Sequence, residues 1–255
     1  TTRYILEHSE AKVLFVGKLD AIWAEMAPGV PTDVRQVSFP LSPPGNYEKW
    51  DDIVSRHEPL AQVAQRSLDE MATIIYTSGS TGQPKGVMLS FGAMAAPTEI
   101  LVDLLGLNST DRMLSYLPMA HVMERWLGGC CSTRAPFQLF FAESPETFLQ
   151  DLQRASPTLF VSVPRLWLKF QTGVFRKMPS KKLDRLLAIP ILGGIVKKKV
   201  LRGLGLDQVR FAASGSAPLP AELMAWYRRL GLELLEGYGM TENFNFSHVS
   251  KLGQM

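Results

Sequence analysis

Short apolar runs rich in β-branched residues alternate along this chain with stretches of helical periodicity. Strands are expected over residues 12–16, 34–39, 72–76, 158–163, 208–213 and 232–235, and helices over 19–26, 89–106, 144–155 and 220–230. Ser144 is expected to cap the third helix, with Pro145 in its first turn. This alternation predicts an α/β fold with mostly parallel sheets covered by helices. Ligands bind such sheets at the carboxyl ends of the strands, which points to the loops after Tyr76, Ala213 and Glu236.

The composition fits a globular domain. The chain has 255 residues, of which 46% are hydrophobic and 20% charged, enough for a well-buried core. It begins Thr-Thr-Arg instead of Met, so we expect a piece of a longer protein. The adjacent Cys130 and Cys131 suit neither a disulfide framework nor a zinc site, and are expected to be packing residues in a reducing compartment, which favours the cytoplasm.

A glycine- and hydroxyl-rich loop follows the strand 72–76, with the sequence Tyr-Thr-Ser-Gly-Ser-Thr-Gly-Gln-Pro-Lys-Gly over residues 76–86. Its glycines would let the backbone approach an anion, its hydroxyls could donate, and Lys85 adds a positive charge. The residues expected to bind a polyphosphate are Thr77, Ser78, Gly79, Ser80, Thr81, Gly82 and Lys85. A Walker A loop is excluded, because that motif needs Gly before the Lys and Ser or Thr after it, and Lys85 lies between Pro84 and Gly86.

This loop resembles the phosphate-loop signature of the adenylate-forming superfamily, and two further motifs match in the same order. Residues 214–219 resemble the turn of small residues along the nucleotide, and residues 236–242 resemble the G-Y-G-x-T-E motif. The resemblance implies that AMP or ATP contacts Gly215, Ser216, Ala217, Glu236, Gly237, Tyr238, Gly239, Met240, Thr241 and Glu242. Tyr238 can stack on a purine, and Glu242 together with Thr77 would hold Mg²⁺.

A fourth segment, Leu-Pro-Met-Ala-His-Val-Met-Glu-Arg over residues 117–125, resembles the form seen in long-chain fatty acyl-CoA synthetases. His121 would then lie near the carboxylate being activated, and with Lys85, Thr241 and Glu242 it completes the expected catalytic set. For Glu124 and Arg125 we expect a structural ion pair. Residues 163–165 resemble another element near the acyl pocket, but they equally fit a strand-ending Pro followed by a solvated Arg.

The resemblance implies a two-step ligase reaction. A fatty acid would react with Mg-ATP to give an acyl-adenylate and pyrophosphate, and coenzyme A would then displace AMP. Residues 1–255 would form part of the large AMP-binding N-terminal domain, with core motifs at 76–242 and without the family's small C-terminal domain, so the chain alone is expected to be incomplete for catalysis. The alternatives are an amino- or aryl-acid adenylating domain and a non-catalytic module that binds ATP or lipid.

The basic residues concentrate in one segment. Residues 169–202 carry ten Lys or Arg against the single acid Asp184, whereas the rest of the chain has 17 basic and 23 acidic residues. One interpretation is a solvated helical insertion. Another is a peripheral contact with an anionic membrane, in which Leu186, Leu187, Ile189, Ile191 and Leu192 enter the lipid. Nucleic-acid binding is not expected, because no recognition fold accompanies the charge.

Overall fold

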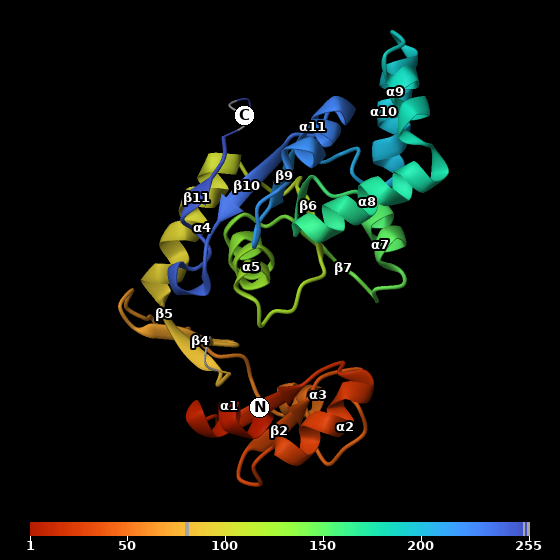
Figure 1. Cartoon of the computed structure of the whole chain (residues 1–255). Helices are drawn as coiled ribbons and strands as arrows, with labels where there is room; N and C mark the ends of the chain where they lie inside the picture. Colours follow the sequence, from red (N-terminus) through yellow and green to blue (C-terminus); the bar gives the residue numbers. More distant parts are fainter. Residues whose placement is uncertain (80–81, 252, 254–255) are drawn as a thin grey trace. The chain divides into compact units, whose positions relative to one another are not determined.

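The computed structural model describes residues 1–79, 82–251 and 253. The chain divides into two compact units, Thr1–Met88 and Leu89–Met255, called unit 1 and unit 2 below (Figure 1). Each unit contains parallel strands and helices, so the α/β prediction is confirmed. Within the described residues, no helix combines the length and the apolar character that a bilayer span requires.

Unit 1 contains a small parallel sheet and a separate strand pair. The sheet has the order β1 (Val13–Val16), β2 (Arg35–Ser38), β3 (Glu48–Lys49). Its helices are α1 (Thr2–His8), α2 (Trp23–Met26, between 3-10 turns Asp20–Ile22 and Ala27–Gly29) and α3 (Trp50–Ser55). The pair consists of β4 (Met71–Thr77) and β5 (Lys85–Ser90), whose last two residues belong to unit 2.

Unit 2 is built on a four-stranded sheet and a parallel pair. The sheet has the order β11 (His248–Val249), β10 (Leu234–Tyr238), β9 (Phe211–Ser214), β8 (Leu159–Ser162), in which only β11 is antiparallel to its neighbour. The pair is β6 (Arg112–Ser115) with β7 (Gln138–Phe141). The helices and helical turns are α4 (Phe91–Leu105), α5 (Val122–Glu124), the π-helix Arg125–Cys131, α6 (Ser132–Arg134), α7 (Phe148–Ala155), α8 (Pro164–Lys177), α9 (Ser180–Leu187), α10 (Leu192–Gly203), α11 (Ala221–Leu230) and the 3-10 turn η4 (Thr241–Asn243).

The core of unit 2 lies between the strands and helices α7, α8 and α11. Trp167 of α8 and Tyr227 of α11 are both fully buried, with their rings 5.1 Å apart. The Tyr227 hydroxyl donates to the Trp167 carbonyl at 2.8 Å, so the polar end of the buried tyrosine has a hydrogen-bond partner. Burial raises the pKa of the Tyr227 hydroxyl, so it stays a hydrogen-bond donor.

Two expectations about local structure are wrong. The strand before the phosphate loop does not join either of the larger sheets, since within the described residues β4 pairs with β5, the next strand along the chain. Helix α7 begins at Phe148 and not at a Ser144 cap. The reason is local: the Thr147 N–H donates to Ser144 Oγ at 3.3 Å, and this turn delays the helix by one turn.

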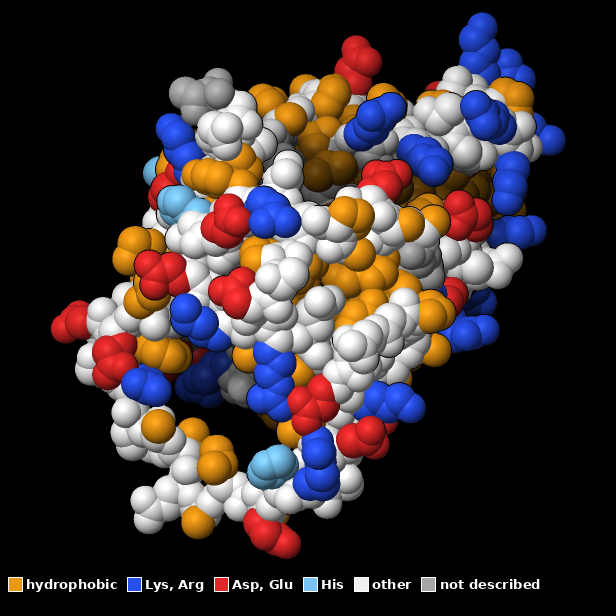
Figure 2. Space-filling view, turned by 90° about the horizontal axis from the view of Figure 1, so that it is seen from below, with side chains coloured by type: hydrophobic (Ala, Val, Ile, Leu, Met, Phe, Trp, Pro, Cys, Tyr) orange, Lys and Arg blue, Asp and Glu red, His pale blue; other side chains and the backbone are white. Residues whose placement is uncertain are grey.

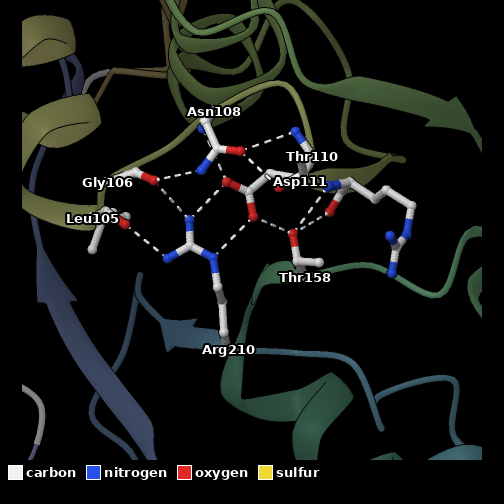
Figure 3. Close-up of polar contacts among 8 residues, drawn as sticks. Leu105, Gly106, Asn108, Thr110, Asp111, Thr158 and Arg210 are labelled. Atoms are coloured by element: carbon white, nitrogen blue, oxygen red, sulfur yellow. Dashed lines mark hydrogen bonds and ion pairs between the residues drawn. The ribbon is translucent and has the colours of Figure 1, made fainter.

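A buried polar cluster ties together the amino-terminal edge of the unit 2 strands (Figure 3). Asp111, which is 2% exposed, accepts hydrogen bonds from Arg210 and from Thr158. Arg210 also donates to the carbonyl oxygens of Leu105 and Gly106 at the end of α4. Burial by itself would raise the pKa of Asp111, but the hydrogen bonds to the carboxylate outweigh it and lower that pKa.

Candidate functional site

A cavity of about 110 Å³ lies at the carboxyl ends of β8, β9 and β10 in unit 2. The expected site residues that line it are His121, Gly215, Ser216, Gly237 and Gly239. They come from three separate motifs, and the structure brings them together around one space. Small-molecule sites commonly measure roughly 300–1,000 Å³, so this cavity alone accommodates part of a nucleotide or acid.

His121 has a defined hydrogen-bonding state. It is the N-cap of α5, and its Nδ1 accepts a hydrogen bond from the Met123 N–H at 3.2 Å. A neutral imidazole that accepts through Nδ1 carries its proton on Nε2. His121 therefore has an Nε2–H donor left over at the cavity that it lines.

The two glycine motifs approach each other through their backbones. A Cβ on Gly215 would lie 3.3 Å from the carbonyl oxygen of Gly237 on the neighbouring strand. A Cβ on Gly239 would lie only 2.3 Å from the carbonyl oxygen of Asn245, so a larger residue there would displace the backbone. The next residue after Gly215, Ser216, has a φ of 69°, a left-handed conformation that is unfavourable for serine and is found at ligand sites.

Sequence reasoning missed Ser162, Trp126 and residues 245–249 at the cavity, and it included Ser214 only as part of the small-residue turn. Ser162 and Ser214 are paired in the register of β8 and β9, and both line the cavity. The Ser214 hydroxyl oxygen is buried and has no hydrogen-bond partner among the described residues, so it is available to a ligand. The wall also includes Trp126 and residues 245–249. A serine at the carboxyl end of β8 and of β9 is a sequence signal that could have predicted these two cavity residues. The position of residues 245–249 at the cavity wall depends on tertiary packing, which the sequence pattern does not show.

The remaining residues of the small-residue turn and the G-Y-G-x-T-E motif do not line this cavity; they are Ala217, Glu236, Tyr238, Met240, Thr241 and Glu242. Glu236 accepts a hydrogen bond from the Leu219 N–H at 2.8 Å and so joins the two motifs. Tyr238 is 60% exposed at the end of β10, where its ring lies 6.2 Å from the His248 ring and most of its surface is accessible to a base. Glu242 is exposed on η4.

The expected phosphate-binding residues belong to unit 1. Thr77 ends β4, Lys85 begins β5, and Ser78, Gly79 and Gly82 lie between them, while Ser80 and Thr81 are outside the described residues. Gly79 has a φ of 60°, and a Cβ there would lie 2.5 Å from the carbonyl oxygen of Gln83. Only glycine fits that position. The Lys85 side chain is exposed, as a residue that meets a soluble ligand must be.

The two expected magnesium ligands lie in different units, Thr77 in unit 1 and Glu242 in unit 2. A hydroxyl and a carboxylate are the hard oxygen donors that Mg²⁺ prefers, and Mg²⁺ usually keeps several waters and binds substrate phosphates as well. The described residues contain no group of three or more His, Cys, Asp or Glu placed to hold a metal without such help. Taken one at a time, the Thr77 hydroxyl and the Glu242 carboxylate are oxygen donors of the kind that Mg²⁺ accepts.

The expected ion pair between Glu124 and Arg125 is wrong. In the part of the chain that the structure describes, no ion pair joins them: Glu124 is fully buried and accepts from the Leu117 N–H, while Arg125 Nε donates to the Met119 carbonyl. The hydrogen bonds from the Leu117 N–H and to the Met119 carbonyl both hold the loop 117–121, which contains His121. Burial raises the pKa of the Glu124 carboxyl, because a charge there would be poorly solvated.

Comparison with known proteins gives consistent results. A family model described as "AMP-binding enzyme" matches residues 1–253. Long chain acyl-CoA synthetase 3 of Arabidopsis thaliana is 32% identical over 229 aligned residues, which cover 79% of this chain and 34% of that protein. The chain covers 42% of a second relative, long chain acyl-CoA synthetase 5 of the same plant, so it spans well under half the length of these relatives.

Solved structures share the fold. Apo MatB from Rhodopseudomonas palustris superposes with a TM-score of 0.67 at 25% identity. The superposition covers 99% of this chain and 44% of the MatB chain. The anthranilate CoA ligase AuaEII in complex with anthranoyl-AMP superposes with a TM-score of 0.70 at 22% identity. This superposition covers 99% of this chain and 45% of the AuaEII chain. At that identity the second likeness shows the fold alone.

Proposed function

The chain belongs to the AMP-binding enzyme family, and from this premise we propose that the protein containing it is an adenylate-forming ligase that activates a long-chain fatty acid. A carboxylate oxygen attacks the α-phosphorus of ATP, the bond from that phosphorus to the bridging oxygen breaks, and pyrophosphate leaves with the electron pair. The thiolate sulfur of coenzyme A then attacks the acyl carbon of the adenylate, and AMP leaves.

The observation that supports this proposal best is the cavity that gathers His121, Gly215, Ser216, Gly237 and Gly239. In the proposal the glycine backbone lets the nucleotide lie flat along β9 and β10. The Nε2–H of His121 donates to the carboxylate or acyl-phosphate oxygen and holds it in line with phosphorus. The orientation of that donor follows from the Nδ1 contact with the Met123 N–H.

The phosphate groups require charge neutralisation more than a protein nucleophile. We propose that the backbone and hydroxyls of residues 77–82 and the Lys85 ammonium bind the β- and γ-phosphates. Thr77 and Glu242 would hold Mg²⁺, which when bound supplies positive charge to the phosphate oxygens, and Thr241 adds a hydroxyl donor. Ala217, Glu236, Tyr238 and Met240 would flank the adenosine.

The same proposal assigns residues 1–255 to part of the large N-terminal domain, since the chain spans only 34% and 42% of the two plant relatives. The cellular setting proposed is the cytoplasm, with a peripheral contact between residues 169–202 and an anionic membrane. Long-chain acids partition into bilayers, so a ligase at the membrane surface would meet its substrate there.

An aryl-acid ligase is the second candidate, and the fold shared with AuaEII is the observation in its favour. A fatty-acid substrate is favoured by the 32% identity to a long chain acyl-CoA synthetase. The two candidates differ in the acid that supports the first half-reaction. A fatty acyl-CoA synthetase forms an adenylate with a fatty acid, whereas an aryl-acid ligase forms one with an aromatic acid.

The test is exchange of labelled pyrophosphate into ATP by the full-length gene product, with palmitate or benzoate as the acid. We expect exchange with palmitate only, and a loss of about 10²-fold in Lys85→Ala, as for other preorganised transition-state donors. Lys12→Ala, at another exposed lysine of unit 1, is the matched control and should leave exchange unchanged. Exchange without added acid, or an active Lys85→Ala enzyme, would overturn the proposal, and exchange with benzoate alone would favour the aryl-acid ligase.

A further inference from the structure

Helices α9 and α10 form a hairpin that extends away from the sheet of unit 2 (Figure 1). The two helices meet closely at the turn, because a Cβ on Gly193 would lie 2.6 Å from the carbonyl oxygen of Leu187. Glycine at this position allows the backbones to touch and closes the hairpin tightly. The turn between them, residues 188–191, is therefore the outermost part of a defined structure.

The end of this hairpin exposes large aliphatic side chains. Ile189, Ile191, Leu192 and Ile195 are 46%, 86%, 38% and 60% exposed, and they are called the apolar tip below. Leu186 and Leu187, which the sequence also assigned to the lipid, are instead partly buried, and Leu187 packs against the core. Exposed aliphatic side chains gathered in one place mark a surface that meets an apolar partner.

Ile191, the last residue of the turn, has an unfavourable backbone conformation. Its φ is 68° and its ψ is −58°, and the Leu192 N–H donates to the Pro190 carbonyl at 2.7 Å, which makes a tight three-residue turn. A β-branched residue is destabilising at these backbone dihedral angles, which glycine adopts readily. The Ile191 side chain is 86% exposed, so its burial in the core does not offset this cost.

Five lysines, called the basic collar below, lie on both helices of the hairpin, further from the turn than Ile189, Ile191, Leu192 and Ile195. It consists of Lys181 and Lys182 on α9 and Lys197, Lys198 and Lys199 on α10. Lys198 is six residues from Leu192, which is about 9 Å along a helix axis. Figure 2, a view from below, shows Lys and Arg side chains along the right-hand edge of that face.

The charge of the collar is not compensated within the hairpin. The hairpin carries one acid, Asp184, and that carboxylate is bound by Arg229 of α11 at 2.6 Å. Among the described residues, no ion pair involves a collar lysine. The collar thus presents a positive surface at a fixed depth behind an apolar end.

We propose that the apolar tip inserts into an anionic phospholipid membrane while the basic collar binds the headgroups. Peripheral proteins bury apolar side chains about 5–10 Å into the headgroup and acyl boundary, which matches the distance of about 9 Å from Leu192 to Lys198 along α10. A second copy of this chain would bring two positive collars together, and a nucleic acid would leave the tip in water. This inference rests on the membrane contact proposed for residues 169–202 and not on the ligase chemistry.

The experiment is co-sedimentation of the 255-residue chain with vesicles of phosphatidylcholine, with or without about 30% phosphatidylglycerol, in the absence of ATP and fatty acid. We expect binding only to the anionic vesicles and weaker binding at high salt. Ile191→Asp should lower the partition constant by about tenfold or more. Lys197→Gln, Lys198→Gln and Lys199→Gln combined should lower it by about 10²-fold.

Leu41→Asp is the matched control, because Leu41 is also a positive-φ aliphatic residue, with a φ of 67° and 80% exposure, but it lies in unit 1. It should bind as the unchanged chain does. Equal binding by Ile191→Asp and the unchanged chain, equal binding to neutral vesicles, or a tip-dependent dimer in light scattering without vesicle binding would each overturn the proposal. Since no substrate is present, failure here leaves the ligase proposal untouched, and absent pyrophosphate exchange leaves vesicle binding intact.

Discussion

Replacement of Arg210 by Ala tests whether the buried cluster of Figure 3 stabilises unit 2. The Arg210 guanidinium donates from Nε to Asp111 Oδ1 at 2.9 Å and from Nη2 to Asp111 Oδ2 at 2.7 Å. It also donates to the Leu105 carbonyl at 2.7 Å. The variant removes these donors together and leaves the Asp111 carboxylate, whose side chain is 3% exposed, with Thr158 Oγ1 and the Asn108 N–H as its remaining donors.

The expected loss follows from the burial of the carboxylate. Removing one member of a fully buried ion pair costs about 3–5 kcal/mol. The Arg210 side chain is 42% exposed, so solvent screens part of the interaction, and we expect a loss of about 2–3 kcal/mol in the free energy of unfolding. Arg229→Ala is the matched control: its pair with Asp184 has the similar distance of 2.6 Å, but both side chains are about half exposed, at 49% and 45%. That variant should lose less than about 1 kcal/mol.

The assay is urea unfolding followed by the fluorescence of buried tryptophans in unit 2, such as Trp167. The pKa of Asp111 is lowered in the folded state, so the stabilisation is present above the ordinary carboxyl pKa of about 4 and is lost as the pH falls through the lower folded value. The difference between Arg210→Ala and the unchanged chain should therefore shrink below about pH 4. A loss at pH 7 no larger than that of Arg229→Ala, or a difference independent of pH, would refute the reasoning.

Three further outcomes are expected. Gly239→Ala should destabilise unit 2 by about 1–3 kcal/mol, because its Cβ would lie 2.3 Å from the Asn245 carbonyl oxygen; Gly194→Ala, which meets nothing within 4 Å inside α10, should be neutral or stabilising in the same urea assay. Cys131 is fully buried, and burial raises the pKa of its thiol to about 12, so mass spectrometry should find no alkylation of it by iodoacetamide at pH 8 until the chain is unfolded. His121→Asn should keep the cap of α5, and hence the stability, while lowering pyrophosphate exchange of the full-length protein by about 10²-fold; an unchanged exchange rate would remove His121 from the chemistry.

The sequence predicted the elements of unit 2 best where local signals act alone. Helix α11 ends before Gly231, whose φ is 92°, as the spacing of that glycine indicated. Helix α4 begins after the Ser90 cap, contains Pro97, and ends at Gly106 in the left-handed conformation. In these places the residues that begin and end an element are adjacent to it in the chain.

Other features depend on contacts between distant segments, which no local pattern contains. The pairing of β4 with β5 decides where the phosphate loop lies, and strand periodicity does not specify a partner. Glu124 was expected to pair with Arg125 because the two are adjacent in sequence. In the fold its carboxylate turns to the N–H of Leu117, seven residues away, since burial leaves a backbone donor as the better partner.

The parallel arrangement of β8, β9 and β10 separates stability from ligand binding in unit 2. Strands that run the same way have all their amino ends at one edge, where Asp111, Thr158 and Arg210 bind one another. All their carboxyl ends lie at the other edge, where Ser162 and Ser214 line the cavity. Strand β8 begins next to Thr158 and β9 next to Arg210, and both strands end at the cavity, so the cluster and the two serines lie at opposite ends of these strands. A variant such as Arg210→Ala is therefore expected to lower the free energy of unfolding without changing which side chains line the cavity.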